Sequence, residues 1–405
     1  MTVRNQWRRD GVDDPGRVPG ARANALRHAA SGMVVLASVV ATVVLHVRHP
    51  DALVTLLPGA DMRDLHVDFD TFWHSAVALV GGADIYETPA KLTNLNPPLL
   101  TLLLVPFAGL DALTAYRVFA VGTLLVVVAA VVAVARELRL TRPVTALVVL
   151  AVLASSPLHG TLVLGQIYPL LLAGLVAGWI AERRGRPVLA AVLYGFTVAL
   201  KPSLAPLLLL PAVQRRWRPF RAGIAGAAGA TLLGVLAAGP SSAFTWLRIA
   251  VSEPVPDTVD NASLPGLAVR FGVPSLLGAL LGAAVLVGTL VWMGRHRDRI
   301  DPAGTAPWAV LAAGLLFSPI AWHNYLMLLW PGVLLLVTLG LGGVAAAALA
   351  VAVVPVSWNA EWTGDSIAAD VARSLYFVVL LGYWLALMWT ASRPRTSARP
   401  AAPAG

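Results

Sequence analysis

Long apolar runs alternate with short polar segments along most of this 405-residue chain. The runs are continuous stretches of Ala, Leu, Val and Gly rather than alternating apolar and polar positions, which favours membrane helices over strands. Hydropathy places about twelve such segments. They fall at about 29–48, 113–135, 143–157, 166–181, 187–200, 203–213, 221–239, 274–294, 303–319, 323–339, 341–357 and 372–391. The predicted fold class is therefore an all-α, multi-pass membrane protein.

Arginine clusters between the runs predict the direction of each crossing. They are WRR near the N-terminus, RELRLTR (136–142), ERRGR (182–186), QRRWRPFR (214–221), GRHRDR (294–299) and SRPRTSAR (392–399). Basic loops stay in the cytoplasm, so a chain that starts inside and crosses at each run accounts for all of them. This requires that PPLLTLLLVPFAGL (97–110), short and proline-containing, is re-entrant or interfacial rather than spanning. The predicted outer loops are 49–112, 158–165, 201–202, 240–273, 320–322 and 358–371.

Polar segments at the two ends of the chain flank one predicted membrane domain. Residues 1–28 and 392–405 are rich in Arg, Pro and Gly or Ala, which predicts two disordered cytoplasmic tails. Residues 29–391 form the integral membrane domain, with 49–112 as its first outer loop. The first apolar run lacks a small-residue cleavage site, so we expect it to be a retained span. The predicted location is the plasma membrane, with both termini cytoplasmic.

Composition narrows the classes of function. The chain is 58% hydrophobic and 13% charged, and its net charge is +9. Its arginines lie in separate clusters rather than on one basic face, so membrane lipids, not nucleic acid, are the predicted partners. Cysteine is absent, which excludes a disulfide, a thiolate nucleophile and a Cys-ligated metal. With no P-loop, dinucleotide motif or metal-ligand spacing in the sequence, no cofactor or metal is predicted.

The first predicted outer loop concentrates acids and histidines in HVDFDTFWHSAVALVGGADIY (66–86). Asp68 lies just before an amphipathic run, so a helix along the membrane surface would hold its carboxylate at the interface. A partly desolvated carboxylate in that place can act as a general base toward a sugar hydroxyl. The alternative is that Asp68 caps the helix or faces water. Asp64 and Asp70 fit that alternative better.

Lys201 is one of two lysines in the chain, with Lys91. It is followed by a proline, between apolar runs (187–200 and 203–213) of about 14 and 11 residues, each too short to span. We therefore expect a shallow hairpin or a broken pair of helices with Lys201 at the bend. A lysine at depth costs about 2.5–3.5 kcal/mol, which argues for a cavity and an anionic partner such as a lipid phosphate. The alternative is a lysine that snorkels to the outer interface.

A third group of candidates lies in FSPIAWHNYLMLLWP (317–331). Trp322, His323 and Asn324 would sit at the outer end of one helix, where they can bind sugar hydroxyls, a phosphate or a sugar ring. The alternative is an interfacial aromatic belt. Weaker candidates on the same side are Gln166, Asn94, Asn96, Arg117, Arg270 and the segment 261–264. Polar groups from six segments would then meet on one side of the membrane, as in a site built between helices.

Several blocks of the chain resemble glycosyltransferase family 87, the polyprenyl-phosphate-mannose-dependent mannosyltransferases of actinobacteria. The first outer loop carries the pattern at Asp68, Phe72, Gly81–Gly82, Tyr86 and Asn96–Pro97–Pro98. Three more blocks agree in order: GQIYPLLLAGL, ALKPSLAPLLLL, and NASLPGLAVRF followed by SPIAWHNY. The resemblance covers roughly residues 30 to 340. This family includes the phosphatidylinositol-mannoside and lipomannan α-1,2-mannosyltransferases.

This resemblance implies a C-type glycosyltransferase fold with its catalytic Asp in the first outer loop. The donor would be a polyprenyl-phosphate sugar, and the acceptor a glycolipid or lipoglycan reached from the extracytoplasmic side. The base role falls on Asp68 and the phosphate contact on Lys201. Further substrate contacts are expected from Gln166, His323, Trp322, Asn324, Arg117, Arg270, Asn96 and Tyr86. Family members often place one residue between Trp and His, whereas His323 directly follows Trp322.

The expected reaction is an inverting transfer. Asp68 deprotonates an acceptor hydroxyl, which attacks the anomeric carbon of a β-linked polyprenyl-phosphate mannose and gives an α product. Lys201 stabilises the departing phosphate, with Arg117 or Arg270 as further candidates, and no metal is required. Two alternatives stay open: a flippase for a lipid-linked sugar, which would not need Asp68, and an arabinofuranosyltransferase or another lipid-phosphate-sugar transferase.

Overall fold

The computed structural model of the chain describes residues 62–258, 260–339 and 366–391. The predicted tails, 1–28 and 392–405, and the apolar runs 29–48 and 341–357 lie outside these ranges.

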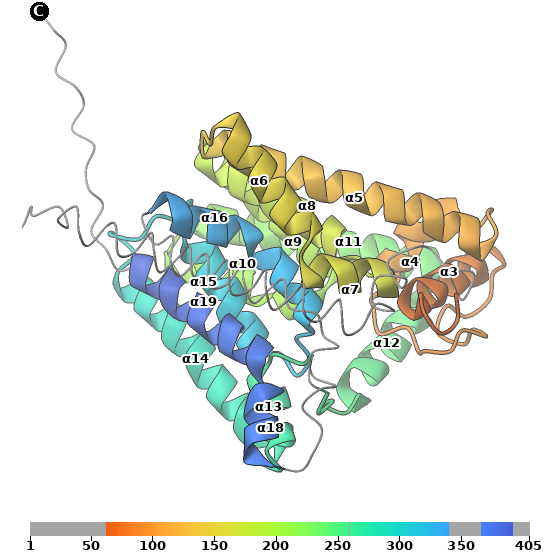
Figure 1. Cartoon of the computed structure of the whole chain (residues 1–405). Coiled ribbons are helices and arrows are strands. Elements are labelled where there is room, and N and C mark those ends of the chain that lie inside the picture. Colours follow the sequence, from red (N-terminus) through yellow and green to blue (C-terminus); the bar gives the residue numbers. More distant parts are fainter. Residues whose placement is uncertain (1–61, 259, 340–365, 392–405) are drawn as a thin grey trace, which may run out of the picture.

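All regular secondary structure within the described ranges is helical, as the sequence predicts (Figure 1). The α-helices are α3 (Val67–Val80), α4 (Pro98–Leu104), α5 (Ala112–Glu137), α6 (Arg142–Leu153), α7 (Ser156–Leu164), α8 (Tyr168–Arg183), α9 (Pro187–Leu200), α10 (Pro206–Val213), α11 (Trp217–Ala238), α12 (Pro240–Ser252), α13 (Leu264–Arg270), α14 (Ser275–Arg295), α15 (Ala306–Phe317), α16 (Trp330–Thr338), α18 (Ile367–Ala372) and α19 (Leu375–Ala391). The 3₁₀-helices are η1 (Val105–Phe107), η2 (Pro202–Leu204) and η3 (His323–Leu329).

Three of the described helices, α5, α11 and α14, are long and apolar enough to cross a membrane. The pair α6 and α7, bent by 50°, makes a fourth if it counts as one span. The other apolar helices are shorter: α9, with 14 residues, covers about 21 Å, against about 30 Å of hydrocarbon. Twelve full spans are therefore not confirmed. The predicted crossings 187–200 and 203–213 are the short helix α9 and the pair η2 and α10.

Helices also occupy stretches that the sequence predicts as outer loops. Helix α7 covers most of 158–165, and both α12 and α13 lie within 240–273. Each of these three helices has a proline in its first turn, where the missing N–H has no intrahelical partner in any case. In these segments, proline therefore marks the start of a helix rather than a break in one.

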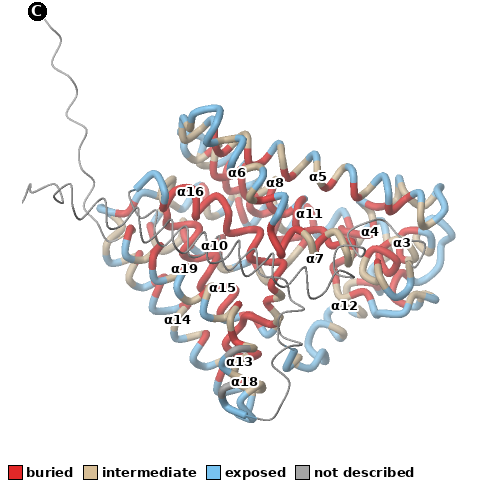
Figure 2. Tube along the Cα trace, in the orientation of Figure 1, coloured by how far each residue is buried: buried red, intermediate tan, exposed pale blue. Residues whose placement is uncertain are grey.

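The helices pack into a bundle whose inner faces are buried. Helix α9 packs between α8 and α11, and α5 packs against α8, with α3 and α4 together at one end (Figure 1). Figure 2 shows the buried positions along the inner helix faces and the exposed ones on the outer faces. Large apolar side chains on the outer faces of α5, α11 and α14, such as Leu125, Leu236 and Leu280, are more than half exposed. Such a surface is suited to lipid contact.

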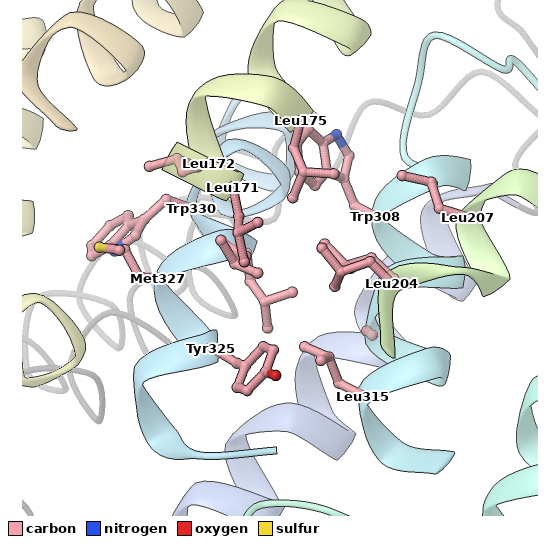
Figure 3. Close-up of a cluster of buried hydrophobic side chains, with 14 of the residues drawn as sticks. Leu171, Leu172, Leu175, Leu204, Leu207, Trp308, Leu315, Tyr325, Met327 and Trp330 are labelled. Carbon is pink, nitrogen blue, oxygen red and sulfur yellow. The ribbon is translucent and has the colours of Figure 1, made fainter. Parts of the chain in front are cut away.

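A dense apolar cluster joins α8, η2, α10, α15, η3 and α16 (Figure 3). Leu171, Leu204 and Trp308 are buried in it, and Tyr325 lies at one end of the group drawn. Because lipid is as apolar as these side chains, close packing rather than escape from water holds such a cluster together. Tyr325 connects this core to the polar residues described next.

Candidate active site

Asp68 lies in the first turn of α3 and faces the junction between α7 and α8. The Nε2 atom of Gln166, at that junction, donates a hydrogen bond of 2.6 Å to Asp68 Oδ2. The helix begins after His66, and α3 has no side-chain cap among the described residues. Asp68 is therefore not the N-cap that the sequence left open, because its partner comes from a segment far along the chain.

Gly165 brings that junction onto α3. It ends α7 with φ of 75°, in the left-handed region that favours glycine, and a Cβ atom there would collide with the side chain of Phe69. Phe69 is fully buried and packs against the ring of Tyr116 at a centroid distance of 5.5 Å. The close approach of Gly165 to the residue after Asp68 sets Gln166 opposite the carboxylate.

His66 fixes the other side of the start of α3. Its ring stacks on Tyr116 of α5 with centroids 3.8 Å apart, and its Nδ1 atom lies 2.6 Å from the carbonyl oxygen of Val163. The Tyr116 hydroxyl donates to the carbonyl oxygen of Leu162. These contacts join the first turn of α3 to helix α5 and to the end of α7. Asp68 is therefore held at the anchored end of α3.

The environment of Asp68 changes its acidity. Burial raises the pKa of its carboxyl to about 6, while the hydrogen bond from Gln166 and the charge of Lys201 lower it. Such a carboxyl is still mostly ionised at neutral pH and is more basic than an ordinary aspartate. This is the property of a general base that works near pH 7.

Lys201 occupies the break between α9 and η2, as predicted. Its backbone is extended, with φ of −143° and ψ of 90°, because the following Pro202 disfavours helix at this position. Its Nζ atom donates to Asn96 Oδ1 at 3.2 Å and lies 6.0 Å from the centroid of the Tyr325 ring. The ammonium group is half-buried among protein partners and acts electrostatically on Asp68.

Asn96 belongs to a buried hydrogen-bond network that ties its segment to α3. Asn94 Nδ2 donates to Ser75 Oγ at 3.0 Å, and the Asn96 N–H donates to Asn94 Oδ1 at 2.9 Å. The Tyr86 hydroxyl donates to the carbonyl oxygen of Asn96 at 3.0 Å. Buried polar groups are costly unless paired, so this network fixes the amide that meets Lys201. Tyr86 and Asn94 thus hold Asn96 in place.

The neighbouring acids have partners of their own. Asp64 forms an exposed ion pair with Lys91, which lowers the pKa of the Asp64 carboxyl. Asp70 is buried on α3, 3.7 Å from His74 in the next turn, and its burial raises the pKa of that carboxyl. Neither pair involves Gln166 or Lys201. Asp68 is the acid of this segment that accepts a hydrogen bond from the distant Gln166 amide and lies within electrostatic range of Lys201.

A second carboxylate, Asp260, lies in the loop between α12 and α13 and faces His323. His323 Nδ1 is 3.8 Å from Asp260 Oδ2, and the side chain of Asp260 is 25% exposed while His323 is buried. Burial alone would raise the pKa of the Asp260 carboxyl, but the nearby ring of His323, together with Thr258, holds it below its ordinary value. Asp260 is not among the residues predicted from the sequence, where its one signal is its place directly before the segment 261–264.

Hydrogen bonds clamp the loop onto the chain that precedes η3. Asn261 Nδ2 donates to the carbonyl oxygen of Pro319 at 3.1 Å, and Asn261 Oδ1 accepts from the N–H of Ala321 at 3.0 Å. The N–H of Ala262 donates to the carbonyl oxygen of Ala321 at 2.7 Å. The blocks NASLPGLAVRF and SPIAWHNY, distant in sequence, are therefore one structural unit that sets Asp260 beside His323.

Arg270 holds the same loop from α13. Its Nη2 atom donates at 2.9 Å to each of the carbonyl oxygens of Thr258 and Asn261, which lie on either side of Asp260. Its Nη1 atom donates to Ser374 Oγ at 3.0 Å. The guanidinium thus has protein partners on two segments, and its contact with a substrate phosphate stays a prediction.

Two tyrosine rings connect the carboxylates. The rings of Tyr168 and Tyr325 lie 4.6 Å apart, centroid to centroid. The Tyr168 phenol lies within electrostatic range of both Asp68 and Asp260, and Lys201 lies over Tyr325. We name two groups by their residues: the Asp68 cluster is Asp68, Gln166, Asn96 and Lys201, and the Asp260 cluster is Asp260, His323, Arg270 and Asn261.

Helix α7 covers His323 and its neighbour Asn324. Asn324 is 1% exposed, and a Cβ atom at Gly160 would collide with Asn324 Oδ1 and His323 Nε2. Trp322 is half-buried and pairs with Asn261 through an isolated β-bridge. The structure therefore brings these three predicted residues to the Asp260 cluster.

Arg117 lies apart from both clusters. It is exposed on α5, whereas its neighbour Tyr116 is buried and faces α3. Within the described ranges, no three His, Asp or Glu side chains are placed to hold a metal ion. That the reaction needs no metal stays a prediction.

Comparison with known proteins places the chain in a family. A sequence model of glycosyltransferase family 87 matches residues 94–319, more than half of the chain. An α-(1→3)-arabinofuranosyltransferase of Mycobacterium tuberculosis (strain ATCC 25618 / H37Rv) is 30% identical over 281 residues, 65% of this chain and 64% of that protein. The chain thus spans just under two thirds of the length of that relative.

Two further relatives match similar stretches. An α-(1→3)-arabinofuranosyltransferase of Corynebacterium glutamicum is 26% identical over 288 residues, 65% of this chain and 66% of that protein. A polyprenol-phosphate-mannose-dependent α-(1→2)-phosphatidylinositol mannoside mannosyltransferase of M. tuberculosis is 26% identical over 301 residues, 66% of this chain and 68% of that protein. The family match includes Gln166, Lys201 and Asp260, while Asp68 lies before its first residue and His323 after its last. Because the match covers more than half of its residues, the chain belongs to glycosyltransferase family 87.

Proposed function

We propose that the protein is a membrane glycosyltransferase that moves a glycosyl residue from a polyprenyl-phosphate sugar to a glycolipid or lipoglycan acceptor. The observation that carries this proposal is the presence in one cluster of a basic carboxylate, Asp68, and a cation, Lys201, whose charge acts on that carboxylate. Transfer from a lipid phosphate needs these two charges, one to take a proton and one to face the leaving phosphate. Membership of glycosyltransferase family 87 supports the same reaction class.

The Asp68 cluster supports an inverting mechanism. Asp68 takes the proton of the acceptor hydroxyl as its oxygen attacks the anomeric carbon. The bond between that carbon and the phosphate oxygen breaks, and its electron pair leaves with the phosphate. The ammonium group of Lys201, oriented by Asn96, stabilises the negative charge that develops there. Phosphate is a good leaving group, so neither a general acid nor a metal is part of this proposal.

The first candidate for the sugar is mannose, joined as an α-1,2 linkage. It rests on the likeness of the first outer loop to mannosyltransferases and on the mannosyltransferase relative. The second candidate is arabinofuranose, which is favoured by the 30% identity to an arabinofuranosyltransferase. Both donors share the polyprenyl phosphate that Lys201 would face.

We further propose a C-type glycosyltransferase fold of about twelve membrane segments in the plasma membrane, with cytoplasmic termini and an extracytoplasmic active site. Ion pairs support this topology. Arg184 at the end of α8 pairs with Glu137 at the end of α5, and Arg216 pairs with Glu182. Three arginine clusters therefore meet at one end of α8, and the other end begins at Tyr168, beside the Asp68 cluster.

The test is a transfer assay with purified protein and a membrane glycolipid fraction. Labelled polyprenyl-phosphate mannose and polyprenyl-phosphate arabinofuranose are supplied separately to the wild type, Asp68→Asn and Asp70→Asn. We expect product from one donor with the wild type and Asp70→Asn, and none with Asp68→Asn. A wild type that transfers neither sugar but moves the donor lipid across liposomes would replace the enzyme with a flippase.

A further inference from the structure

The proposed reaction leaves the carboxylate of Asp260 without a role. Its pKa lies below the ordinary value, so it is ionised at neutral pH, and it is too weak a base to compete with Asp68. A partly buried charge is costly, and the fold retains this one within electrostatic range of Tyr168, as it does Asp68. Such a group calls for a function that needs charge rather than basicity.

The surroundings of Asp260 are built asymmetrically. His323 lies behind the carboxylate, buried and covered by Gly160 of α7, while the Asp260 side chain keeps a quarter of its surface exposed. Arg270 binds the backbone on both sides of Asp260, at Thr258 and Asn261. The backbone around Asp260 is thus held in place beside His323, while part of its side chain stays accessible.

Rigid support of an exposed carboxylate is typical of a ligand site. The clamp between Asn261 and the chain before η3 fixes the backbone on the C-terminal side of Asp260. A purely structural ion pair does not require one partner to stay accessible, and a solvated surface acid does not require this scaffold. An ionised carboxylate has only acceptor oxygens, which suits it to donors such as the vicinal hydroxyls of a sugar.

We propose that Asp260 is a specificity-determining residue that accepts hydrogen bonds from sugar-ring hydroxyls, with His323 as the positioning residue behind it. The rings of Tyr168 and Tyr325 are buried against each other, and the Tyr168 phenol lies within electrostatic range of both carboxylates. This inference rests on the proposed glycosyl transfer. It assigns the two carboxylates different tasks, because Asp68 removes a proton and Asp260 recognises the sugar.

The sugar that Asp260 binds belongs to either the donor or the acceptor, and kinetics distinguish the two. Hydrogen bonds made equally in the ground state and the transition state change KM and leave kcat nearly unchanged. Loss of a charge-assisted pair of bonds weakens binding by roughly 10- to 100-fold. The affected substrate is the one whose KM rises.

The experiment measures kcat and both KM values for the wild type, Asp260→Asn, His323→Gln and Asp370→Asn. Asp370 is the matched control, because it is a partly buried acid paired with Arg373 on α18. We expect Asp260→Asn to raise one KM by about 10- to 100-fold with kcat within about threefold of the wild type. His323→Gln raises the same KM by a smaller factor, and Asp370→Asn changes neither constant.

The inference is overturned if both KM values stay within about twofold of the wild type in Asp260→Asn, or if kcat falls alone. Equal rises in both KM values with a lower melting temperature would assign Asp260 to structure. If Asp260→Asn aggregates, Asp260→Glu is measured instead. It keeps the charge but displaces the carboxylate, so we expect the same KM to rise. A wild type without transfer activity would refute the proposed function instead, so the two failures are distinguishable.

Discussion

The Asp68 and Asp260 clusters place the same functional group in two contrasting environments. Asp68 meets a neutral amide from Gln166 and only a more distant cation, so burial prevails and raises the pKa of its carboxyl to about 6. Asp260 faces the ring of His323 at 3.8 Å, and the effect of this ring, together with Thr258, outweighs burial and lowers the pKa of the Asp260 carboxyl. The nature of the nearest partner, more than burial itself, decides whether a carboxylate becomes basic or stays charged.

The two clusters also differ in how they are assembled. The Asp68 cluster joins four segments through single contacts, with Gly165 allowing the closest approach. In the Asp260 cluster, one loop is joined to the chain before η3 by two hydrogen bonds of the Asn261 side chain and one backbone hydrogen bond from Ala262. Small shifts between helices would therefore disturb the first cluster more than the second.

The largest expected effect is the loss of the base. Asp68→Asn keeps the size of the side chain and can still accept from Gln166, but it cannot take a proton. We expect kcat to fall by roughly 10²- to 10⁴-fold. The matched variant Asp70→Asn, two residues along α3, should keep activity within about threefold. Equal losses in both variants would mean that α3 matters only for folding.

Loss of the cation comes next. Lys201→Gln removes the charge and leaves a side chain that can still meet Asn96, so we expect kcat to fall by about 10²- to 10³-fold. Lys91→Gln is the control, because Lys91 is the one other lysine and forms an exposed ion pair with Asp64. Unchanged kcat in Lys201→Gln would remove the lysine from the mechanism.

A smaller effect is expected at Gln166. Its hydrogen bond favours the charged form of Asp68, so Gln166→Ala raises the pKa of that carboxyl. Less of the base is then ionised in weak acid. We expect about a tenfold loss of kcat/KM at pH 6 and a smaller loss at pH 8. An equal loss at both pH values would show that Gln166 affects placement alone.

The smallest expected effect is on stability, and it has the opposite sign. Folding raises the pKa of Asp68, so the folded state becomes less favourable as the pH rises from the ordinary value of 3.8 to about 6. Asp68→Asn removes this cost, at most about 3 kcal/mol. We expect its Tm to exceed that of the wild type by about 2–5 °C at pH 7.5 and to equal it below about pH 4. A lower Tm at pH 7.5 would contradict the desolvation of Asp68.

Sequence reasoning succeeds where local chemistry decides the structure. The bend at Lys201 follows from Pro202 and two apolar runs too short to span, and the structure confirms it. The all-α class follows from the length and composition of the apolar runs. These features need no knowledge of distant contacts.

Sequence reasoning fails where a long-range contact decides the structure. Nothing local in Gln166 or Asp68 indicates that they meet, since the contact depends on the left-handed backbone of Gly165 and its fit against Phe69. Asp260 is missed for a similar reason. A lone acid in a loop is usually a cap or solvated, and its contact with His323 exists only in three dimensions.

The central claim is that protonation of Asp68 causes the loss of activity at acid pH. The pH dependence of kcat/KM tests this claim most directly. The profile is measured from pH 4.5 to 8.5 for the wild type and Asp260→Asn. Asp68 must be ionised to act, so activity should fall tenfold per pH unit below about 6 in both proteins. Activity in the wild type that does not fall between pH 6 and 4.5, or a fall that shifts in pH when Asp260 is replaced, would contradict the assignment of the two carboxylates.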